Sequence, residues 1–357
     1  MATVSLNQAS VITDGVRRLD GVTLAIPDGE FVGVVGGSGS GKSTLLRAIA
    51  GLERLAAGAV EIGGIDMTAR TPGERNVGLV FQTPALMGHR SVRRNVSFPL
   101  EMRRQDAEEI RNRVNAEARA LHIEDLLHRN PTELSQGEQQ MVQIARTLVR
   151  VPAVLLLDEP FASLDEHLRH RMRAEIALLQ RGYGVTAIMS SNDPLDMTTL
   201  TSWLAVLDAG RLVQFDETDT VRRSPATLFA AAATGSLSIV PMTVVRDSTG
   251  YWLVRDDPAG GELVRIRAWS PAFARHVGTE VLVAFRPESV VVSEHGAVPA
   301  RVERRVPVPP GSLQCLLAGA RLTVRIDGPS TLEPGDQVRL RIDHFVAFDK
   351  PTESVIR

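Results

Sequence analysis

Short apolar runs alternate with segments of helical periodicity in the first part of the chain. The run "FVGVV" at residues 31–35 is rich in β-branched residues and ends in glycines, which predicts a buried strand. Similar runs at residues 154–159, "VLLLDE", and 185–191, "VTAIMSS", predict further buried strands. A helix is expected from Ser43 to a glycine stop at Gly51. This alternation predicts an α/β core with a parallel sheet.

An amphipathic helix is predicted within residues 105–123, "QDAEEIRNRVNAEARALHI". The apolar positions of this segment recur at helical spacing and fall on one face. They are Ala107, Ile110, Val114, Ala118 and Leu121.

The pattern changes near residue 235. Beyond it come short β-rich runs such as "YWLV", "EVLVAF" and "RLTVRI", separated at close intervals by Gly, Pro and Asp. This pattern predicts a small all-β domain, a sandwich or an OB-like barrel. We therefore predict a first domain over residues 1–235 and a second over residues 236–357. Trp252, Trp269 and Phe285 are expected in the core of the second domain rather than on a ligand platform.

Composition narrows the class of protein. A chain of 357 residues favours two domains, and 43% hydrophobic with 23% charged residues is ordinary for a soluble globular protein. The net charge of -2 argues against nucleic acid as a partner and against a polybasic membrane anchor. The single cysteine, Cys315, is expected to be a small buried residue in a reducing compartment. No secretory signal or membrane span is expected, so other chains would have to bring this protein to a membrane.

A glycine-rich loop, "GGSGSGKSTLL" at residues 36–46, carries the clearest chemistry. It fits the pattern G-x-x-x-x-G-K-[ST], in which glycines let successive backbone N–H groups converge on a phosphate. The following helix directs its positive end at the same anion. We expect Lys42 to reach the β and γ phosphates and the Ser43 hydroxyl to ligate Mg²⁺. The predicted nucleotide-binding residues of this loop are Gly36, Gly37, Ser38, Gly39, Ser40, Gly41, Lys42, Ser43 and Thr44.

Two adjacent carboxylates end the buried run "VLLLDE". Asp158 is predicted to hold Mg²⁺ through its water shell. Glu159 stands beside it, placed to polarise an attacking water as a general base. Loop and carboxylates together predict a nucleoside triphosphatase.

The stretch "LSQGEQQMVQIARTLVR" at residues 134–150 resembles the LSGGQ-type signature of ABC transporter ATPases. The order of motifs is also similar to that family: the phosphate loop, "VFQ" at residues 80–82, the signature, and "LLLDEPFASLD" at residues 155–165. The resemblance covers roughly the first 235 residues, and implies a helical subdomain at about residues 85–150.

The resemblance implies that one copy cannot complete its own ATP site. ATP would lie on the phosphate loop of one copy and beneath the signature helix of a second, so that ATP joins the copies and hydrolysis releases them. Gln82 would contact Mg²⁺ and water and report the nucleotide state to a membrane partner, and Asp165 would couple the two sites. The signature residues placed on the nucleotide of the partner copy are Ser135, Gln136 and Gly137.

Two other stretches resemble bacterial carbohydrate importers of the maltose type. These are residues 75–100, "RNVGLVFQTPALMGHRSVRRNVSFPL", and residues 285–290, "FRPESV", which is similar to an element of their β-rich C-terminal domain. The resemblance implies a peripheral protein on the cytoplasmic face of the inner membrane. Its partners would be two transmembrane permease subunits and, indirectly, an extracytoplasmic solute-binding protein. Importers of polyamines, ferric iron and oxyanions share this plan and remain alternatives.

The chain departs from the family pattern at several positions. Asn192 stands where the family has a histidine that touches the γ phosphate, and an amide cannot titrate or carry charge. Thr13 occupies the slot of an aromatic residue that stacks on adenine, which predicts weaker affinity or base selectivity. Ile12 is the candidate for a replacement apolar floor. In the signature, Gln136 and Glu138 replace a glycine and a glutamine, changes that we expect to be tolerated.

We therefore predict an ATP-hydrolysing subunit that powers sugar import. The alternative from another class is a weakly hydrolytic nucleotide-binding subunit that dimerises on ATP and regulates. Asn192 and the missing aromatic favour this alternative, whereas Lys42, Asp158, Glu159 and Ser135 disfavour it. An exporter or a soluble ABC protein is disfavoured by the importer-like second domain.

Overall fold

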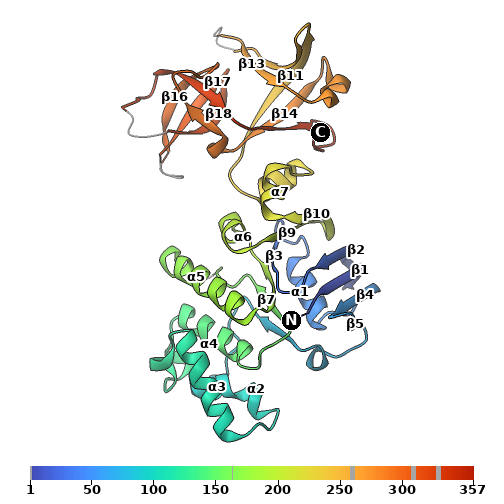
Figure 1. Cartoon of the computed structure of the whole chain (residues 1–357), viewed down its shortest axis with the longest axis vertical. Coiled ribbons are helices and arrows are strands. Elements are labelled where there is room, and N and C mark those ends of the chain that lie inside the picture. The colour runs from blue at the N-terminus through green and yellow to red at the C-terminus, as the bar shows by residue number, and fades with distance from the viewer. Residues whose placement is uncertain (1, 163, 258–261, 307–310, 327–330) are drawn as a thin grey trace. The chain divides into compact units, whose positions relative to one another are not determined.

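The computed structural model describes residues 2–162, 164–257, 262–306, 311–326 and 331–357. The chain forms two compact units, Met1–Asp219 and Thr220–Arg357 (Figure 1). This division falls before helix α8 (Leu228–Ala233). The start of α8 belongs with the second unit because the Leu228 amide donates to the Glu353 carbonyl at 2.9 Å, and Ala231 packs with Phe348.

A six-stranded sheet forms the centre of the first unit. Its strand order is β10-β9-β3-β8-β7-β6, parallel except for the edge strand β10. The bounds are β3 Phe31–Val35, β6 Val77–Val80, β7 Val154–Asp158, β8 Thr186–Ser190, β9 Trp203–Asp208 and β10 Arg211–Glu217. The α/β prediction is confirmed, with β3, β7 and β8 as the strands expected from their apolar runs.

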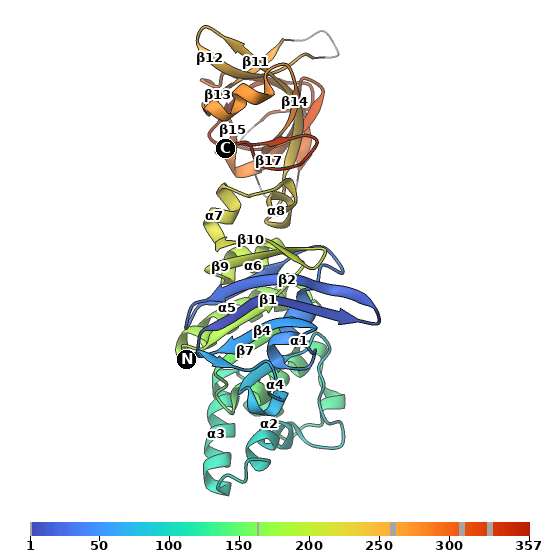
Figure 2. The same ribbon diagram turned by 90° about the vertical axis from the view of Figure 1, so that its right-hand side faces the viewer.

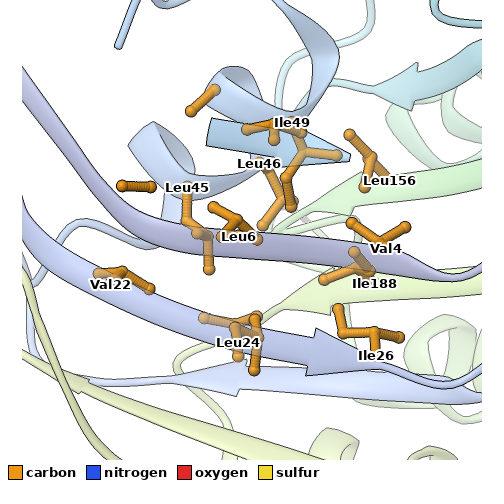
Figure 3. Packing of buried hydrophobic residues seen from close by; sticks show 14 of the residues in the cluster. Val4, Leu6, Val22, Leu24, Ile26, Leu45, Leu46, Ile49, Leu156 and Ile188 are labelled. Atoms are coloured by element: carbon orange, nitrogen blue, oxygen red, sulfur yellow. The ribbon is translucent and has the colours of Figure 1, made fainter. Parts of the chain in front are cut away.

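An antiparallel sheet of order β2-β1-β4-β5 completes the core of the first unit. Its bounds are β1 Val4–Thr13, β2 Val16–Ile26, β4 Ala57–Ile62 and β5 Ile65–Asp66. Helix α1 (Lys42–Ala50) packs against both sheets. Figure 3 shows Leu46 and Ile49 of α1 among side chains of β1, β2, β7 and β8. This packing fixes where α1 begins, and hence where the phosphate loop lies.

Helices α2 (Val92–Glu101), α3 (Ala107–Ala120) and α4 (Gln136–Leu148) lie together at one end of the first unit (Figure 1). The predicted apolar face of α3 buries Val114, Ala118 and Leu121, whereas Ala107 at its first turn is exposed and does not belong to the core. Helices α5 (Glu166–Tyr183) and α6 (Pro194–Leu200) connect the later strands. Of the described helices, none has the length and apolar character required to cross a membrane.

The second unit is built from strands, apart from short helices such as α8, single turns, and the greater part of α7 (Thr218–Arg223), which begins at the last residues of the first unit (Figure 2). It contains a five-stranded sheet of order β13-β12-β11-β14-β20 and a closed barrel of order β15-β18-β17-β16-β19, so the prediction of a small β-barrel is confirmed. The bounds are β11 Ser238–Asp247, β12 Gly250–Arg255, β13 Val264–Ala268, β14 Glu280–Phe285, β15 Val290–Val292, β16 Val298–Val306, β17 Ser312–Leu317, β18 Ala320–Arg325, β19 Gln337–Ile342 and β20 Val346–Asp349.

The aromatic residues of the second unit do not all lie in its core. Phe285 is buried and Trp252 is half-buried, but Trp269 is 76% exposed, so its assignment to the core was wrong. Trp269 lies just beyond the end of β13, where the Arg267 guanidinium packs 4.1 Å from the centre of its ring. Cys315 is buried as expected, and burial raises the pKa of its thiol to about 12.

Candidate active site

The phosphate loop joins β3 to α1 and has the geometry of an anion cradle. Gly41 caps α1 with a φ of 103°, and a Cβ there would lie 2.7 Å from the Arg18 carbonyl, so only glycine fits without strain. Lys42 is 5% exposed and donates from Nζ to the carbonyls of Gly36 at 3.0 Å and Gly37 at 3.1 Å. Its ammonium is therefore already held inside the loop.

The charge balance of the loop suits a phosphate. Burial lowers the pKa of the Lys42 ammonium, while the carboxylates of Glu159 and Asp158 act in the opposite direction. The buried Ser40 hydroxyl has no hydrogen-bond partner among the described residues. A cation beside an unsatisfied hydroxyl is an arrangement that a phosphate would complete.

Two of the three residues predicted to contact Mg²⁺, Ser43 and Asp158, come from distant parts of the chain and are in contact, whereas the third, Gln82, donates to Glu159. The Ser43 hydroxyl donates to Asp158 Oδ1 at 2.8 Å, and Asp158 is 4% exposed. No group of three or more His, Cys, Asp or Glu side chains suited to a metal occurs among the described residues. Magnesium is commonly held by one or two protein oxygens together with substrate phosphates and water, so one hydroxyl and one carboxylate fit it.

Glu159 lies directly beyond β7, and its carboxylate is held from both sides. Asn192 Nδ2 donates to Glu159 Oε1 at 2.6 Å, and Gln82 Nε2 donates to Glu159 Oε2 at 3.3 Å. Its backbone adopts a φ of 45°, which is unfavourable for a residue other than glycine and is found more often at functional sites. The structure thus brings together the three residues predicted to be catalytic.

A pocket of about 370 Å³ opens above the loop. Thr13 lines it, as the sequence predicted, but Ile12 does not. Successive side chains of a strand point to opposite faces, so Ile12 faces away from the pocket and the expectation of an apolar floor was wrong. The lining residues are Thr13, Arg18, Ser38, Gly39, Ser40, Gly41, Lys42, Ser43, Thr44, Arg47, Glu53, Glu159 and Asn192.

The signature residues do not line this pocket within one copy of the chain. Ser135 caps α4, and its hydroxyl donates to Glu138 Oε2 at 2.8 Å, while its amide donates to the same oxygen at 2.8 Å. These two hydrogen bonds hold the pKa of the Glu138 carboxyl below its usual value. Gln136 is the first residue of α4, and a Cβ on Gly137 would come within 2.1 Å of Leu168 of α5.

Asp165 also lies outside the pocket. It caps α5, and its side chain accepts a hydrogen bond from the Leu168 amide at 2.9 Å. The packing of Gly137 on Leu168 therefore joins the tip of the signature helix to the first turn after Asp165.

Sequence reasoning missed Ser190 and Gln143. The Ser190 hydroxyl donates to Asp158 Oδ1 at 2.8 Å and accepts from the Glu159 backbone amide at 3.0 Å, so it orients the Asp158 carboxylate and holds the backbone of Glu159. Gln143 is buried in α4; its side chain donates to the Phe81 carbonyl at 3.0 Å and accepts from the Ala85 amide at 2.8 Å. It ties the loop that carries Gln82 to the signature helix. No local sequence pattern marks either residue.

An ion-pair network that the sequence did not predict holds the Asn192 loop. The Arg173 guanidinium, which is buried in α5, donates to Asp196 at 2.6 Å and to Asp193 at 3.2 Å. The Ser191 hydroxyl donates to Asp196 at 2.5 Å. Asn192 is therefore positioned between two anchored neighbours.

Comparison with known proteins decides the family. The model of the family described as ABC transporter matches residues 19–162. An sn-glycerol-3-phosphate import ATP-binding protein of Roseobacter denitrificans is 36% identical over 358 residues, covering 98% of this chain and 97% of that protein. The chain belongs to the ATP-binding subunits of ABC transporters. It is therefore an ATPase, as the signature and loop predicted.

Other relatives agree with this ABC transporter assignment. A protein of the same description from Cupriavidus necator is 35% identical, covering 98% of each chain. The first unit is also similar to a solved structure of a dimeric ATP-binding cassette in a post-hydrolysis state bound to ADP and Pi. That likeness has a TM-score of 0.55 and 28% identity, and it covers 60% of this chain and 98% of the other.

Exchanging Asn192 for histidine is expected to raise ATP turnover severalfold. In the wild-type chain the amide N–H is directed at Glu159, whereas an imidazole has two ring nitrogens and gains charge near pH 6.5. Steady-state ATPase rates from pH 5.5 to 8.5 should also show an added pH dependence near the pKa of the imidazole compared with the wild type, with Asn192→Ala as the control that removes the contact. Unchanged or lower turnover in Asn192→His would show that this position does not face the γ phosphate.

Proposed function

We propose that this ABC ATPase powers the uptake of a carbohydrate or a polyol phosphate through a membrane permease. The observation that carries the catalytic part is the Glu159 carboxylate held between Asn192 and Gln82, beside the contact of Ser43 with Asp158. The solute class is supported by the relatives, which are sn-glycerol-3-phosphate import ATP-binding proteins, and by the maltose-type sequence elements.

The residues around the phosphate loop have distinct chemical roles in hydrolysis. Lys42 and the amides of the loop neutralise the β and γ phosphates. Ser43 and Asp158 would hold Mg²⁺, which supplies charge stabilisation at the transferred phosphoryl group when bound. Glu159 accepts a proton from the attacking water as the bond to the leaving phosphate breaks, and its two amide donors fix the position of its oxygens.

A second copy of the chain is proposed to complete the site. Ser135, Gln136 and Gly137 form a helix tip that contributes nothing to the pocket of their own copy, yet a helix N-terminus is suited to a phosphate. The similar solved cassette is dimeric with ADP and Pi. Asp165, at the start of α5 beside Gly137, would then lie near the interface and couple the two sites.

The membrane partners follow from the same proposal. The first unit would bind two transmembrane permease subunits at the cytoplasmic face of the inner membrane. An extracytoplasmic solute-binding protein would deliver the solute to the other side of the permease. Because Gln143 ties the Gln82 loop to α4, a movement of the signature helix on ATP would be passed to the loop that reports to the permease.

A weakly hydrolytic regulatory subunit is the second candidate. Two observations favour it. The Ser135 hydroxyl donates its hydrogen bond to Glu138, and position 192 carries an amide, which cannot titrate or carry charge. Reconstitution of the chain with its permease and solute-binding protein in proteoliposomes separates the candidates. ATPase activity stimulated by the solute, with uptake of labelled sn-glycerol-3-phosphate or maltose, supports the importer. ATP turnover at background level in the complete complex would support the regulatory subunit instead. Uptake of a polyamine, iron or an oxyanion would support an importer but contradict the proposed class of solute.

Replacing Glu138 with glutamine is expected to strengthen ATP-dependent dimerisation about fivefold to tenfold. The Glu138 carboxylate places negative charge at the helix tip proposed to meet the γ phosphate, and it occupies the only proton of the Ser135 hydroxyl. Analytical ultracentrifugation with ATP, in a Glu159→Gln background that prevents turnover, measures the effect. Glu133→Gln, an exposed change just before the signature, is the control. Equal or weaker dimerisation in Glu138→Gln would refute this role.

A further inference from the structure

The outer half of the nucleotide pocket is polar and charged. Beyond the phosphate loop its lining residues are Thr13, Arg18, Arg47 and Glu53, and the pocket has no aromatic side chain among the described residues that line it. The Thr13 hydroxyl donates to Glu53 Oε2 at 3.5 Å, so even the residue in the expected stacking slot is directed at a carboxylate. A base placed here meets no flat apolar surface.

Arg18 and Arg47 are placed to act on the same ligand as the loop. Arg47 follows Ser43 and Thr44 by one turn of α1, so the three share a helix face. The Arg18 carbonyl lies against Gly41, which brings the backbone of β2 directly onto the loop. Both arginines are exposed, and within the described part of the chain neither guanidinium forms a hydrogen bond or an ion pair.

We propose that Arg18 and Arg47 form a cationic subsite that holds the nucleotide by charge at its α-phosphate and ribose end and leaves the base unread. The substrate class is then nucleoside triphosphates in general rather than ATP alone. The proposal rests on the proposed role of the loop in triphosphate hydrolysis. The guanidinium groups of Arg18 and Arg47 line the same pocket as the buried Lys42 ammonium and attract the triphosphate. This attraction replaces the affinity that stacking on an aromatic side chain would supply.

Binding, not turnover, tests this subsite. Displacement of a fluorescent nucleotide from the full chain carrying Glu159→Gln is measured with the magnesium complexes of ATP, GTP, CTP and UTP, and with inorganic tripolyphosphate. We expect the four nucleotides to bind within about threefold of one another, and all of them to weaken steeply as potassium chloride is raised, because exposed charges are screened. A preference for ATP over the pyrimidine nucleotides of more than about tenfold would overturn the proposal.

Substitutions assign the effect to the arginines. Arg18→Ala and Arg47→Ala should each weaken all four nucleotides by a similar factor, about fivefold to tenfold, and flatten the salt dependence. Arg18→Lys keeps the charge and should retain most of the affinity. Arg17→Ala is the matched control, because Arg17 is the adjacent exposed arginine, pairs with Asp20 and does not line the pocket. Equal behaviour of Arg18→Ala and Arg17→Ala would contradict the role of Arg18.

A gain of function completes the design. Thr13→Tyr introduces a stacking surface and should tighten ATP about tenfold while leaving tripolyphosphate unchanged. Thermal unfolding of every variant checks that the fold is kept. If no nucleotide binds to the wild-type chain at all, the proposed function fails together with this inference. If ATP binds and is hydrolysed with strong preference for adenine, only the inference fails.

Discussion

Replacing Glu159 with glutamine is expected to lower ATP turnover by about a hundredfold or more, the range lost when a positioned general base is removed. Glutamine keeps the size of the side chain but cannot accept a proton from water. The side-chain amides of Asn192 and Gln82 each donate to an oxygen of the Glu159 carboxylate. In Glu159→Gln one of these oxygens becomes an NH₂ group, so that two hydrogen-bond donors face each other and that hydrogen bond is lost. ATP binding should be retained, because Lys42, Ser43 and the loop amides are unchanged.

Steady-state phosphate release and nucleotide binding on the same preparation measure this separation. Glu109→Gln, the same exchange at an exposed position of α3, is the control and should alter neither the rate of phosphate release nor nucleotide binding. Turnover in Glu159→Gln within threefold of wild type would show that Glu159 is not the base. Loss of binding together with turnover would instead show that Glu159 supports the pocket rather than the chemistry.

Lys42→Met is expected to weaken MgATP binding about thirtyfold to a hundredfold, because a charge-assisted hydrogen bond contributes about 2–3 kcal/mol. The Lys42 ammonium is buried and directed into the loop by the carbonyls of Gly36 and Gly37, so it lies where the phosphates are expected to bind. Methionine has a similar length and fills the same space, which separates the loss of charge from the loss of packing.

Titration of a fluorescent nucleotide measures the change for Lys42→Met. Lys350→Met is the control, since Lys350 lies in the second unit, where it pairs with Glu280 on the surface. Binding by Lys42→Met equal to that of the control would mean that the loop does not hold the triphosphate. The midpoint temperature of thermal unfolding of Lys42→Met should equal that of the wild type or lie slightly above it. Burial lowers the pKa of Lys42, which means that the folded chain holds this charge at a cost in free energy.

The fold could be predicted where burial leaves a local pattern. Strands β3 and β7 lie in the middle of a parallel sheet, are buried throughout, and so appear as continuous apolar runs. Strand β16 was missed because its buried residues Val298, Ala300 and Val302 are followed by a charged run, residues 303–305, and because it forms part of a barrel that closes through long-range pairing with β17 and β19.

The site divides in the same way. The phosphate loop and the adjacent pair Asp158 and Glu159 are continuous in the chain, and their residue types are dictated by phosphate and magnesium chemistry. Ser190 and Gln143 are ordinary polar residues whose roles come only from the groups they meet, so no local pattern marks them. The exposed position of Trp269 was missed for a related reason, because residue type gives only an average burial.

The sequence by itself determined the family, the triphosphate chemistry, the two-part architecture and the positions at which the chain departs from its relatives. Only the tertiary structure decided which groups these positions contact. The Thr13 hydroxyl donates a hydrogen bond to Glu53, the Asn192 amide donates to Glu159, and the Ser135 hydroxyl donates to Glu138. The physical reason is distance along the chain. Ser43 and Asp158 are 115 positions apart, and it is the packing of α1 against two sheets that sets the 2.8 Å contact between them.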